Sequence, residues 1–266
     1  MRIIIGGNNR LAKRVTEWLL ASKADVVMTV PEGKDTVQSP TEWEEPFRDY
    51  AESLKNIPCR VGNVNKFAGE IKNLNPDLIV MLRSASLVRK DILEIPRQGV
   101  LNFHYGELPK YGGCFPIQWA IRNGEKKIGV TLHWMNEKFD EGPILAQRTV
   151  DISTPVRIFR ANGRAIEVRG LTSFEAYLVC NDTALGMFIE SFPLIKSGRA
   201  PRISQDFAKK SYFQSHQIDF QKEKYIDLSA PEETLAREIR VFTFPPKQLP
   251  IGIYAGKELG EFSISK

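Results

Sequence analysis

Three residues in the middle of the chain have side chains that can do chemistry together. Asn102 and His104 stand two residues apart in GVLNFHYGELPKYGG, and Asp140 follows in MNEKFDEGPIL. A carboxylate near an imidazole fixes the tautomer of the ring and favours its charged form. An amide, an imidazole and a carboxylate that converge therefore make a general-base site, which takes a proton from a reacting group.

The stretch that ends at His104 predicts the strand that would aim this pair. Side chains alternate along a strand, so Asn102 and His104 project to one face while Leu101 and Phe103 project to the other. Polar side chains are costly to bury unless they are used or satisfied. The alternative to catalysis is that hydrogen bonds to neighbouring loops satisfy both residues.

Two loops can bring the rest of a site to this strand end. Asp140 precedes Gly142 and Pro143 in a segment bounded by predicted strands, from which its carboxylate can reach back to the sheet edge. The loop ELPKYGG, which follows shortly after His104, is stiffened by Pro109 and turned by glycines, so its backbone can approach a ligand closely.

The elements around these loops predict an α/β fold. Strands are predicted at residues 2–5, 24–30, 76–82, 99–104, 127–135 and 142–152, and helices at residues 10–23, 41–54, 65–75, 89–95, 116–124 and 173–198. Strands that alternate with helices of about a dozen residues form βαβ units. The pattern therefore predicts a doubly wound, mostly parallel sheet, which binds ligands at the carboxyl ends of its strands.

The composition changes after the last of these helices. Prolines and short β-like runs, FTFPP and LPIGIYAG, follow residue 198. We therefore predict an N-terminal catalytic domain over residues 1–198 and a small, β-containing C-terminal domain over residues 199–266.

Length and composition place the chain among ordinary globular proteins of the cytoplasm. With 266 residues, 42% of them hydrophobic and 26% charged, it can bury a sizeable core. Its three cysteines are widely spaced and form no CxxC pair, which speaks against a metal site and a secreted disulfide framework. No apolar run approaching the roughly 20 residues of a membrane span is expected. The net charge of +5 is scattered, so it does not call for nucleic acid.

The central block of the chain resembles a known family. The sequence NFHYGELPKYGGCFPIQWAIRNGEKKIGVTLHWMNEKFDEGPILAQ contains, in order, an Asn-x-His, a Leu-Pro loop, a Trp-Ala helix, a Gly-Val-Thr strand and an Asp-x-Gly loop. The same five elements occur in this order in the folate-dependent formyltransferases, the group of methionyl-tRNA formyltransferase and the sugar N-formyltransferases. The likeness is close over roughly residues 77–150 and looser elsewhere.

This resemblance implies a reaction and gives each of the three residues a role. A formyl group would pass from 10-formyltetrahydrofolate, a co-substrate, to an amine, and no metal would take part. Asn102 would donate to the developing oxyanion. His104 would help to hold that oxyanion and accept the proton of the amine. Asp140 would orient and charge-balance the imidazole.

The resemblance also implies a folate pocket made largely of backbone. In this chain it would be formed by two segments, from which we name Met81, Leu82, Arg83, Ser84 and Leu87, and Asn136, Phe139 and Gly142. The chain departs from the family in its active-site loop, where a serine, a leucine and a later arginine of the usual pattern are missing. This departure leaves the catalytic residues in place and makes the surroundings of the acceptor amine unusual.

The C-terminal part points to the acceptor. From Lys196 onward the chain has twelve Lys or Arg against nine Asp or Glu, a near-balanced count that is weak for a nucleic-acid surface. The segment KKSYFQSHQIDF is similar to that of sugar N-formyltransferases, which implies a nucleotide-linked, dTDP-type amino sugar and a homodimer through the C-terminal domain. We name six substrate residues: Tyr105, Gly106, Lys110, Tyr111, Tyr212 and Phe213.

Three alternatives stay open. Within the enzyme class, the runner-up acceptor is methionyl-tRNA or another amine. A nicotinamide-dependent oxidoreductase is suggested by RIIIGGNN, but the GxGxxG spacing is missing and no acidic residue is expected at the end of the second strand near Val30. A sugar-nucleotide or folate-binding protein without activity would have no need of a base. Trp119 and His133 are interpreted as structural, and His216 carries no signal.

Overall fold

A computed structural model describes residues 1–32, 46–84, 86–161, 164–244, 249–254 and 257–264. The chain divides into two compact units that interleave along the sequence. Unit 1 comprises Met1–His104, Val130–Arg148 and Asn181–Lys210, and unit 2 comprises Tyr105–Gly129, Thr149–Cys180 and Ser211–Lys266. These units do not follow the division predicted at residue 198, because β6, β7 and α6 each contribute residues to both. The division into two domains at residue 198 stays a prediction.

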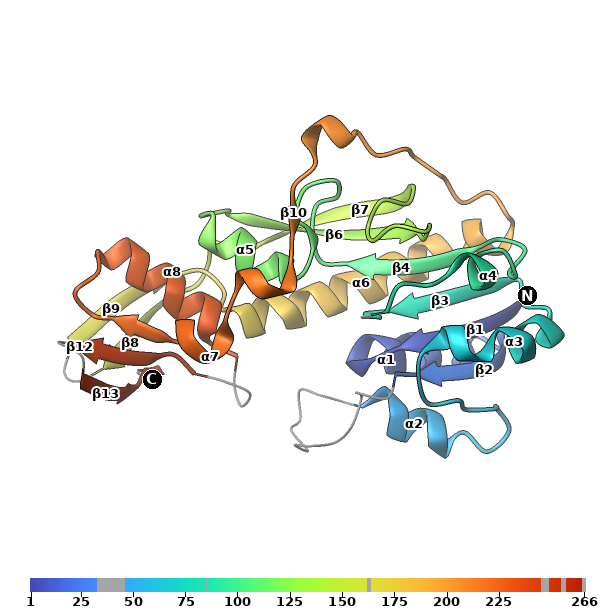
Figure 1. Cartoon of the computed structure of the whole chain (residues 1–266), viewed down its shortest axis with the longest axis horizontal. Helices are drawn as coiled ribbons and strands as arrows, with labels where there is room; N and C mark the ends of the chain where they lie inside the picture. The colour runs from blue at the N-terminus through green and yellow to red at the C-terminus, as the bar shows by residue number, and fades with distance from the viewer. Residues whose placement is uncertain (33–45, 85, 162–163, 245–248, 255–256, 265–266) are drawn as a thin grey trace. The chain divides into compact units, whose positions relative to one another are not determined.

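A six-stranded sheet is the frame of unit 1. Figure 1 shows β3 and β4 between β1 and β6, in the order β2-β1-β3-β4-β6-β7. The pairs β1–β2, β1–β3 and β3–β4 are parallel, and β6 runs antiparallel to β4. The predicted mostly parallel α/β fold is therefore confirmed. The bounds are β1 Arg2–Gly7, β2 Asp25–Pro31, β3 Leu78–Leu82, β4 Val100–His104, β6 Lys127–Trp134 and β7 Ile144–Asp151.

Strands β1 and β3 are nearly continuous apolar runs, as expected of parallel strands that are buried on both faces. Consecutive residues Ile3, Ile4 and Ile5 of β1 have no exposed surface, and every residue of β3 is buried. Ile4 shares one cluster with Ile71 of α3 and Ile92 of α4, so these helices cover one face. Among the described residues the helices are α1 Asn9–Ala21, α2 Phe47–Ser53, α3 Ala68–Leu74, α4 Lys90–Leu93, α5 Pro116–Arg122, α6 Ser173–Lys196, α7 Phe220–Glu223 and α8 Glu232–Phe242, with 3-10 turns at Val64–Phe67, Phe207–Lys209 and Ser215–Gln217.

Helix α6 matches the helix predicted at residues 173–198 and is more apolar than expected. Its 24 residues are long and apolar enough to cross a membrane by length and composition, which corrects the expectation that no such run exists. Its buried side chains include Phe188 and Phe192, which meet the ring of Trp18 edge-on at centroid distances of 5.9 and 5.2 Å. Such packing is typical of a core helix.

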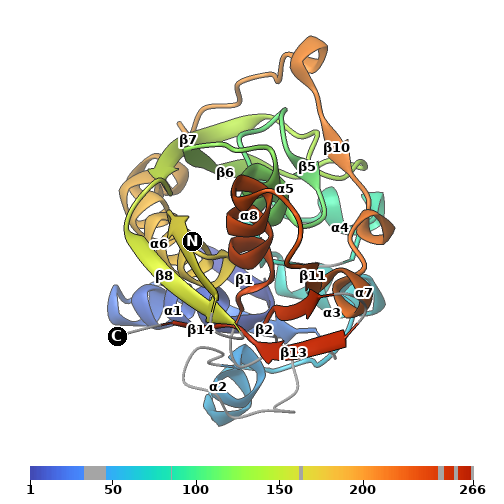
Figure 2. The same cartoon turned by 90° about the vertical axis from the view of Figure 1, so that its left-hand side faces the viewer.

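Unit 2 contains the small sheets of the chain. Strands β8 Val156–Ala161 and β9 Arg164–Arg169 form an antiparallel pair that β14 Ser263–Ile264 extends, and β11 Tyr225–Asp227, β12 Ile251–Tyr254 and β13 Lys257–Glu261 form another sheet (Figure 2). The two-residue strands β5 Gly112–Gly113 and β10 Tyr212–Phe213 pair in parallel. Side chains of Phe159, Ile166, Leu235 and Ile239 share a buried cluster, so α8 packs on this β structure.

The sequence reading of this region was partly right. The run LPIGIYAG contains β12, and its last two residues lie outside the described part. The β-like reading of FTFPP was wrong at Phe242, which ends α8 because Leu235, Ile239 and Phe242 are buried at helical spacing. The β8–β9 pair was not predicted. Of the helix expected at residues 41–54, only Phe47–Ser53 is observed, and residues 41–45 lie outside the described part.

Candidate active site

The end of β4 positions Asn102 and His104 on one face of the sheet. Antiparallel pairing sets Asn102 opposite His133 and His104 opposite Thr131 on β6. His104 is buried, with 7% of its surface exposed, whereas Leu101 and Phe103 belong to the apolar core. The predicted alternation therefore holds, and it places a second polar pair, Thr131 and His133, beside the first.

Asp140 reaches this pair from the loop between β6 and β7. Its Oδ2 lies 3.5 Å from Nδ1 of His104, and its side chain is 12% exposed. The backbone of Asp140 is left-handed, with φ of +57°. A residue other than glycine pays about 1 kcal/mol or more for this conformation, and it persists where the surroundings fix it. The three predicted catalytic residues thus lie together.

His133 joins the cluster as a neutral ring. Its Nδ1 lies 3.1 Å from the carbonyl oxygen of Trp134, which can only accept, so Nδ1 carries the hydrogen. Its Nε2 is then an acceptor, and it takes a hydrogen bond of 3.4 Å from Nδ2 of Asn102. Oδ1 of Asp140 lies 3.8 Å from the same Nε2. The tautomer of His133 thereby fixes which way the amide of Asn102 faces.

Burial sets the charge of His133. Removal from water lowers the pKa of His133 to about 4; Asp140 opposes this shift and His104 adds to it. From the sequence, His133 was interpreted as a structural residue with satisfied hydrogen bonds, and no link to Asn102 was predicted. The available signal was the polar alternation of Thr131 and His133, which repeats that of Asn102 and His104 on the neighbouring strand.

The lowered pKa of His133 makes stability depend on pH. An unfolded chain protonates this ring below about pH 6.5, whereas the folded protein does so only near pH 4. The contribution of His133 to the free energy of unfolding is therefore fully present above about pH 6.5. It is lost as the pH drops toward 4, by about 2 kcal/mol between pH 7 and 4.5. Denaturant unfolding of the wild type and of His133→Leu over this range measures the free energy of unfolding, which should fall less with decreasing pH in the variant.

His216 provides the matched control for this measurement. It is exposed in a short 3-10 turn, so His216→Leu should keep the wild-type dependence on pH. Equal pH slopes for His133→Leu and the wild type would contradict the assignment of a neutral, buried His133.

The predicted folate residues cluster in unit 1 around the ends of β3 and β6. Met81 and Leu82 are the buried last residues of β3, and Arg83 turns the chain with φ of +56°. The hydroxyl of Ser84 donates to Oε1 of Glu32, which follows β2 directly. This corrects the expectation that no acidic residue ends the second strand. The carboxylate of Glu32 is engaged inward, since its other oxygen accepts from Nδ2 of Asn8 at 2.9 Å.

The remaining predicted folate residues differ in exposure. Leu87 and Phe139 expose 36% and 43% of their surfaces. Asn136 holds the turn of its loop by accepting a hydrogen bond of 3.0 Å from the amide of Lys138. A hollow of about 600 Å³ adjoins this loop and is lined by Lys90, Leu93, Glu94, Met135, Asn136, Glu137, Lys138, Glu141 and Phe207. Within the described ranges, no group of three or more His, Cys, Asp or Glu could hold a metal ion.

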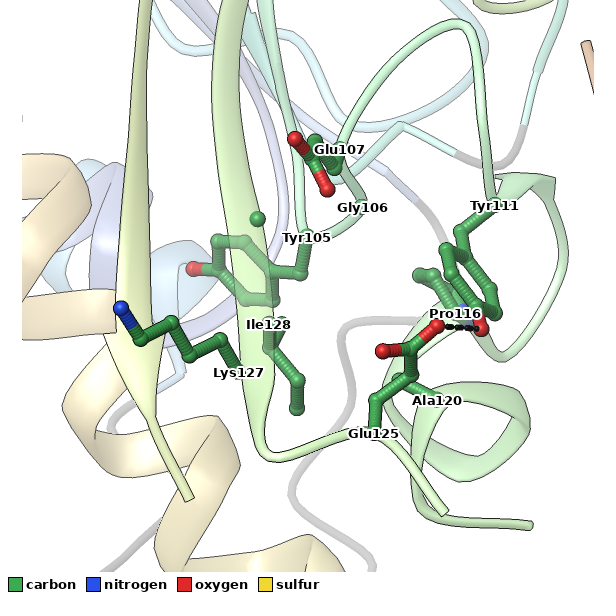
Figure 3. Close-up of a pocket in the computed structure, with 10 residues that line it drawn as sticks. Tyr105, Gly106, Glu107, Tyr111, Pro116, Ala120, Glu125, Lys127 and Ile128 are labelled. Carbon is green, nitrogen blue, oxygen red and sulfur yellow. Dashed lines mark hydrogen bonds between the residues drawn. The ribbon is translucent and has the colours of Figure 1, made fainter. Parts of the chain in front are cut away.

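The six predicted substrate residues all fall in unit 2, whereas the catalytic residues Asn102, His104 and Asp140 belong to unit 1. Figure 3 shows Tyr105, Gly106 and Tyr111 around a hollow of about 10 Å³, which has room for about one water molecule. Burial raises the pKa of Tyr111 to about 12, so its hydroxyl stays protonated and donates to Glu125 at 2.7 Å. Lys110 is exposed. Their assignment to the substrate stays a prediction.

Phe213 is packed more tightly than a free stacking platform would be. Its ring stacks on Trp119 at 4.4 Å and on Tyr111 at 5.9 Å, with interplanar angles of 16° and 19°. Tyr212, by contrast, is 39% exposed. Of the two residues expected to stack on a base, Tyr212 is therefore the more accessible.

Comparison with known proteins gives one family. The family model described as Formyl transferase matches residues 1–158. Methionyl-tRNA formyltransferase from Thermotoga neapolitana is 28% identical over 254 residues, which cover 92% of this chain and 74% of that protein. The corresponding protein from Clostridioides difficile is 34% identical over 147 residues, 55% of this chain and 43% of its own length.

Solved structures share the fold over nearly the whole chain. A 4-N formyltransferase from Francisella tularensis has a TM-score of 0.75 at 20% identity, covering 100% of this chain and 98% of that one. An N-formyltransferase from Helicobacter canadensis, in complex with folinic acid and dTDP-3-aminofucose, has a TM-score of 0.73 at 20% identity, covering 98% and 97%.

Proposed function

Because the chain belongs to the formyl transferase family, we propose that it moves a formyl group from 10-formyltetrahydrofolate to the amino group of a dTDP-linked amino sugar. The observation that carries the proposal is the convergence of Asn102, His104 and Asp140 at the carboxyl-terminal end of strand β4. A purely binding role would give no reason for a buried imidazole and a buried carboxylate 3.5 Å apart.

Asn102 has hydrogen-bonding capacity to spare for the reacting groups. One hydrogen on its Nδ2 goes to His133, which leaves the second for an oxygen that gains negative charge. Its Oδ1 is buried and has no hydrogen-bond partner among the described residues. A buried acceptor without a partner is costly, and an N–H of the attacking amine would satisfy it.

His104 and Asp140 provide for the proton that the amine must lose. Asp140 favours a hydrogen on Nδ1 of His104, which leaves Nε2 with the lone pair that takes the proton. The carboxylate then balances the charge on the ring, and together the two groups would pass the proton on to the folate nitrogen as the bond to the formyl carbon breaks and tetrahydrofolate leaves. Since both groups are largely buried, their interaction is weakly screened by solvent.

The folate loops fit a flat, hydrogen-bonding ring system. Met81 to Ser84 end the parallel strand next to β4, and Asn136 to Gly142 carry Asp140 itself, so both loops lie in unit 1 with the catalytic residues. The co-substrate would supply the formyl carbon there. Apolar Leu87 and Phe139 are exposed in this region and could cover the ring.

A structural comparison supports a sugar acceptor. The fold match to the Helicobacter and Francisella structures covers 97% or more of each chain, and the Helicobacter enzyme is in complex with folinic acid and dTDP-3-aminofucose. The nearly balanced charge after Lys196 also fits a small anionic substrate. A homodimer and a cytoplasmic location stay predictions.

The direct test is product analysis. Purified protein is incubated with 10-formyltetrahydrofolate and a panel of nucleotide-linked amino sugars, and in parallel with methionyl-tRNA, and mass spectrometry identifies formylated products. We expect a formamide on a dTDP-linked amino sugar and none on methionyl-tRNA. Formylation of the tRNA alone would select the runner-up, and retained folate binding without any transfer would support a binding protein.

A further inference from the structure

We propose that Gln205 is a positioning residue that holds the loop of Asp140 in its active conformation. Its side-chain Nε2 donates to two backbone carbonyl oxygens of that loop, that of Asp140 at 2.8 Å and that of Gly142 at 2.7 Å. The inference extends the proposed function, on which the role of Asp140 rests.

The two carbonyl groups leave Gln205 a single orientation. A carbonyl oxygen only accepts, so the amide must face both with its nitrogen. Flipping the amide would set its oxygen against two oxygens. Gln205 is 9% exposed, and its Oε1 has no partner among the described residues. The side chain is therefore committed to the loop through its nitrogen alone.

The loop needs such support because of its own backbone. Asp140 is left-handed, a conformation that the residue itself does not favour and that persists where neighbouring groups fix it. Gln205 bonds the carbonyl of Asp140 and that of Gly142, two residues later, and so fixes the direction in which the chain leaves Asp140. That direction decides whether the carboxylate meets His104.

Gln205 itself is held by a short segment, residues 201–205, that is fastened at three points in unit 1. The indole of Trp134 donates to the carbonyl of Pro201 at 2.8 Å, and the guanidinium of Arg202 lies 3.8 Å from the centre of the same ring. Ile203 exchanges two backbone hydrogen bonds with Ile144, at 2.8 and 2.9 Å. These contacts thus hold the backbone of Gln205 in place beside the loop of Asp140.

Two variants of Gln205 separate the effect of its hydrogen bonds from the effect of its side-chain volume. Gln205→Met keeps the length of the side chain and removes both hydrogen bonds, and Gln205→Glu keeps the shape and sets an oxygen against the two carbonyls. We expect each to lower kcat about 10- to 100-fold, as a displaced catalytic group does, while the KM for the acceptor changes less than threefold. Gln221→Met is the matched control, because Gln221 is exposed on helix α7 of unit 2.

A readout that does not require activity tests the same point. The chain has three histidines, so substitution can assign the imidazole NMR signals. The nitrogen signals of His104 report its contact with Asp140, and we expect them to move in both Gln205 variants and to stay in Gln221→Met. Where Gln205→Met does not fold, Gln205→Glu and the shorter Gln205→Asn carry the comparison.

Folded Gln205 variants with unchanged His104 signals and a kcat within threefold of the wild type would overturn the proposal. So would a large loss of kcat with unchanged His104 signals, because the loss would then not pass through Asp140. A wild type that formylates no acceptor refutes the proposed function instead, and the NMR comparison still decides the role of Gln205.

Discussion

Asp140→Ala and His104→Ala should each lower kcat about 10³-fold, within the range that general acid–base catalysis contributes. The reason is the 3.5 Å contact between Oδ2 of Asp140 and Nδ1 of His104. Without the carboxylate, the imidazole loses the group that orients it and balances its charge. Without the imidazole, the proposed acceptor of the amine proton is lost. Steady-state rates with the accepted amino sugar measure the effect.

Folate affinity should change far less than kcat in these two variants. Predicted contacts to the folate come largely from the backbone of two loops, which alanine at either position retains. Fluorescence or calorimetric titration with a folate analogue measures this. Asp182→Ala is a suitable control, since Asp182 is a surface partner of Arg14 and 66% exposed. A kcat within about threefold of the wild type in both catalytic variants would reject the proposed proton transfer.

The sequence could predict the catalytic pair because alternation along one strand is a local property. Asn102 and His104 need only the strand β4 to face the same way, and the apolar run before them indicates that strand. The alternation of strands and helices and the loop that carries Asp140 also follow from short segments with clear periodicity. These elements are consequently the ones that the structure reproduces.

Contacts that depend on strand register, or that join residues far apart in the sequence, could not be predicted in this way. His133 meets Asn102 only because β6 runs antiparallel to β4 in one particular register. Gln205 arrives 65 residues after Asp140, and no local pattern marks it. The β8–β9 pair, by contrast, had a local signal that was overlooked: β9 alternates the buried Ile166 and Val168 with charged residues, the pattern of a half-buried strand.

Gly142→Ala tests the same loop by steric means and should have the second-largest effect. A Cβ at Gly142 would stand 1.7 Å from the backbone oxygen of Trp134 and 2.8 Å from its carbonyl carbon. Backbone cannot yield as a flexible side chain does, so the loop must move away from β6. The carbonyl of Gly142 would then leave Gln205, and Asp140, two residues before it, would leave His104. We expect a loss of kcat of about 10²-fold, since displacement of about 1 Å suffices for this.

The displaced loop should also be visible in stability. Overpacking of this kind costs about 1 to 3 kcal/mol, which chemical denaturation of Gly142→Ala would measure. Gly186→Ala is the matched control, because a Cβ at Gly186, inside helix α6, has no atom within 4 Å. There the same substitution should keep kcat and raise stability by up to about 1 kcal/mol, the helix preference of alanine over glycine. If Gly142→Ala behaved like Gly186→Ala, the tight apposition of this loop to Trp134 would not be what holds Asp140 against His104.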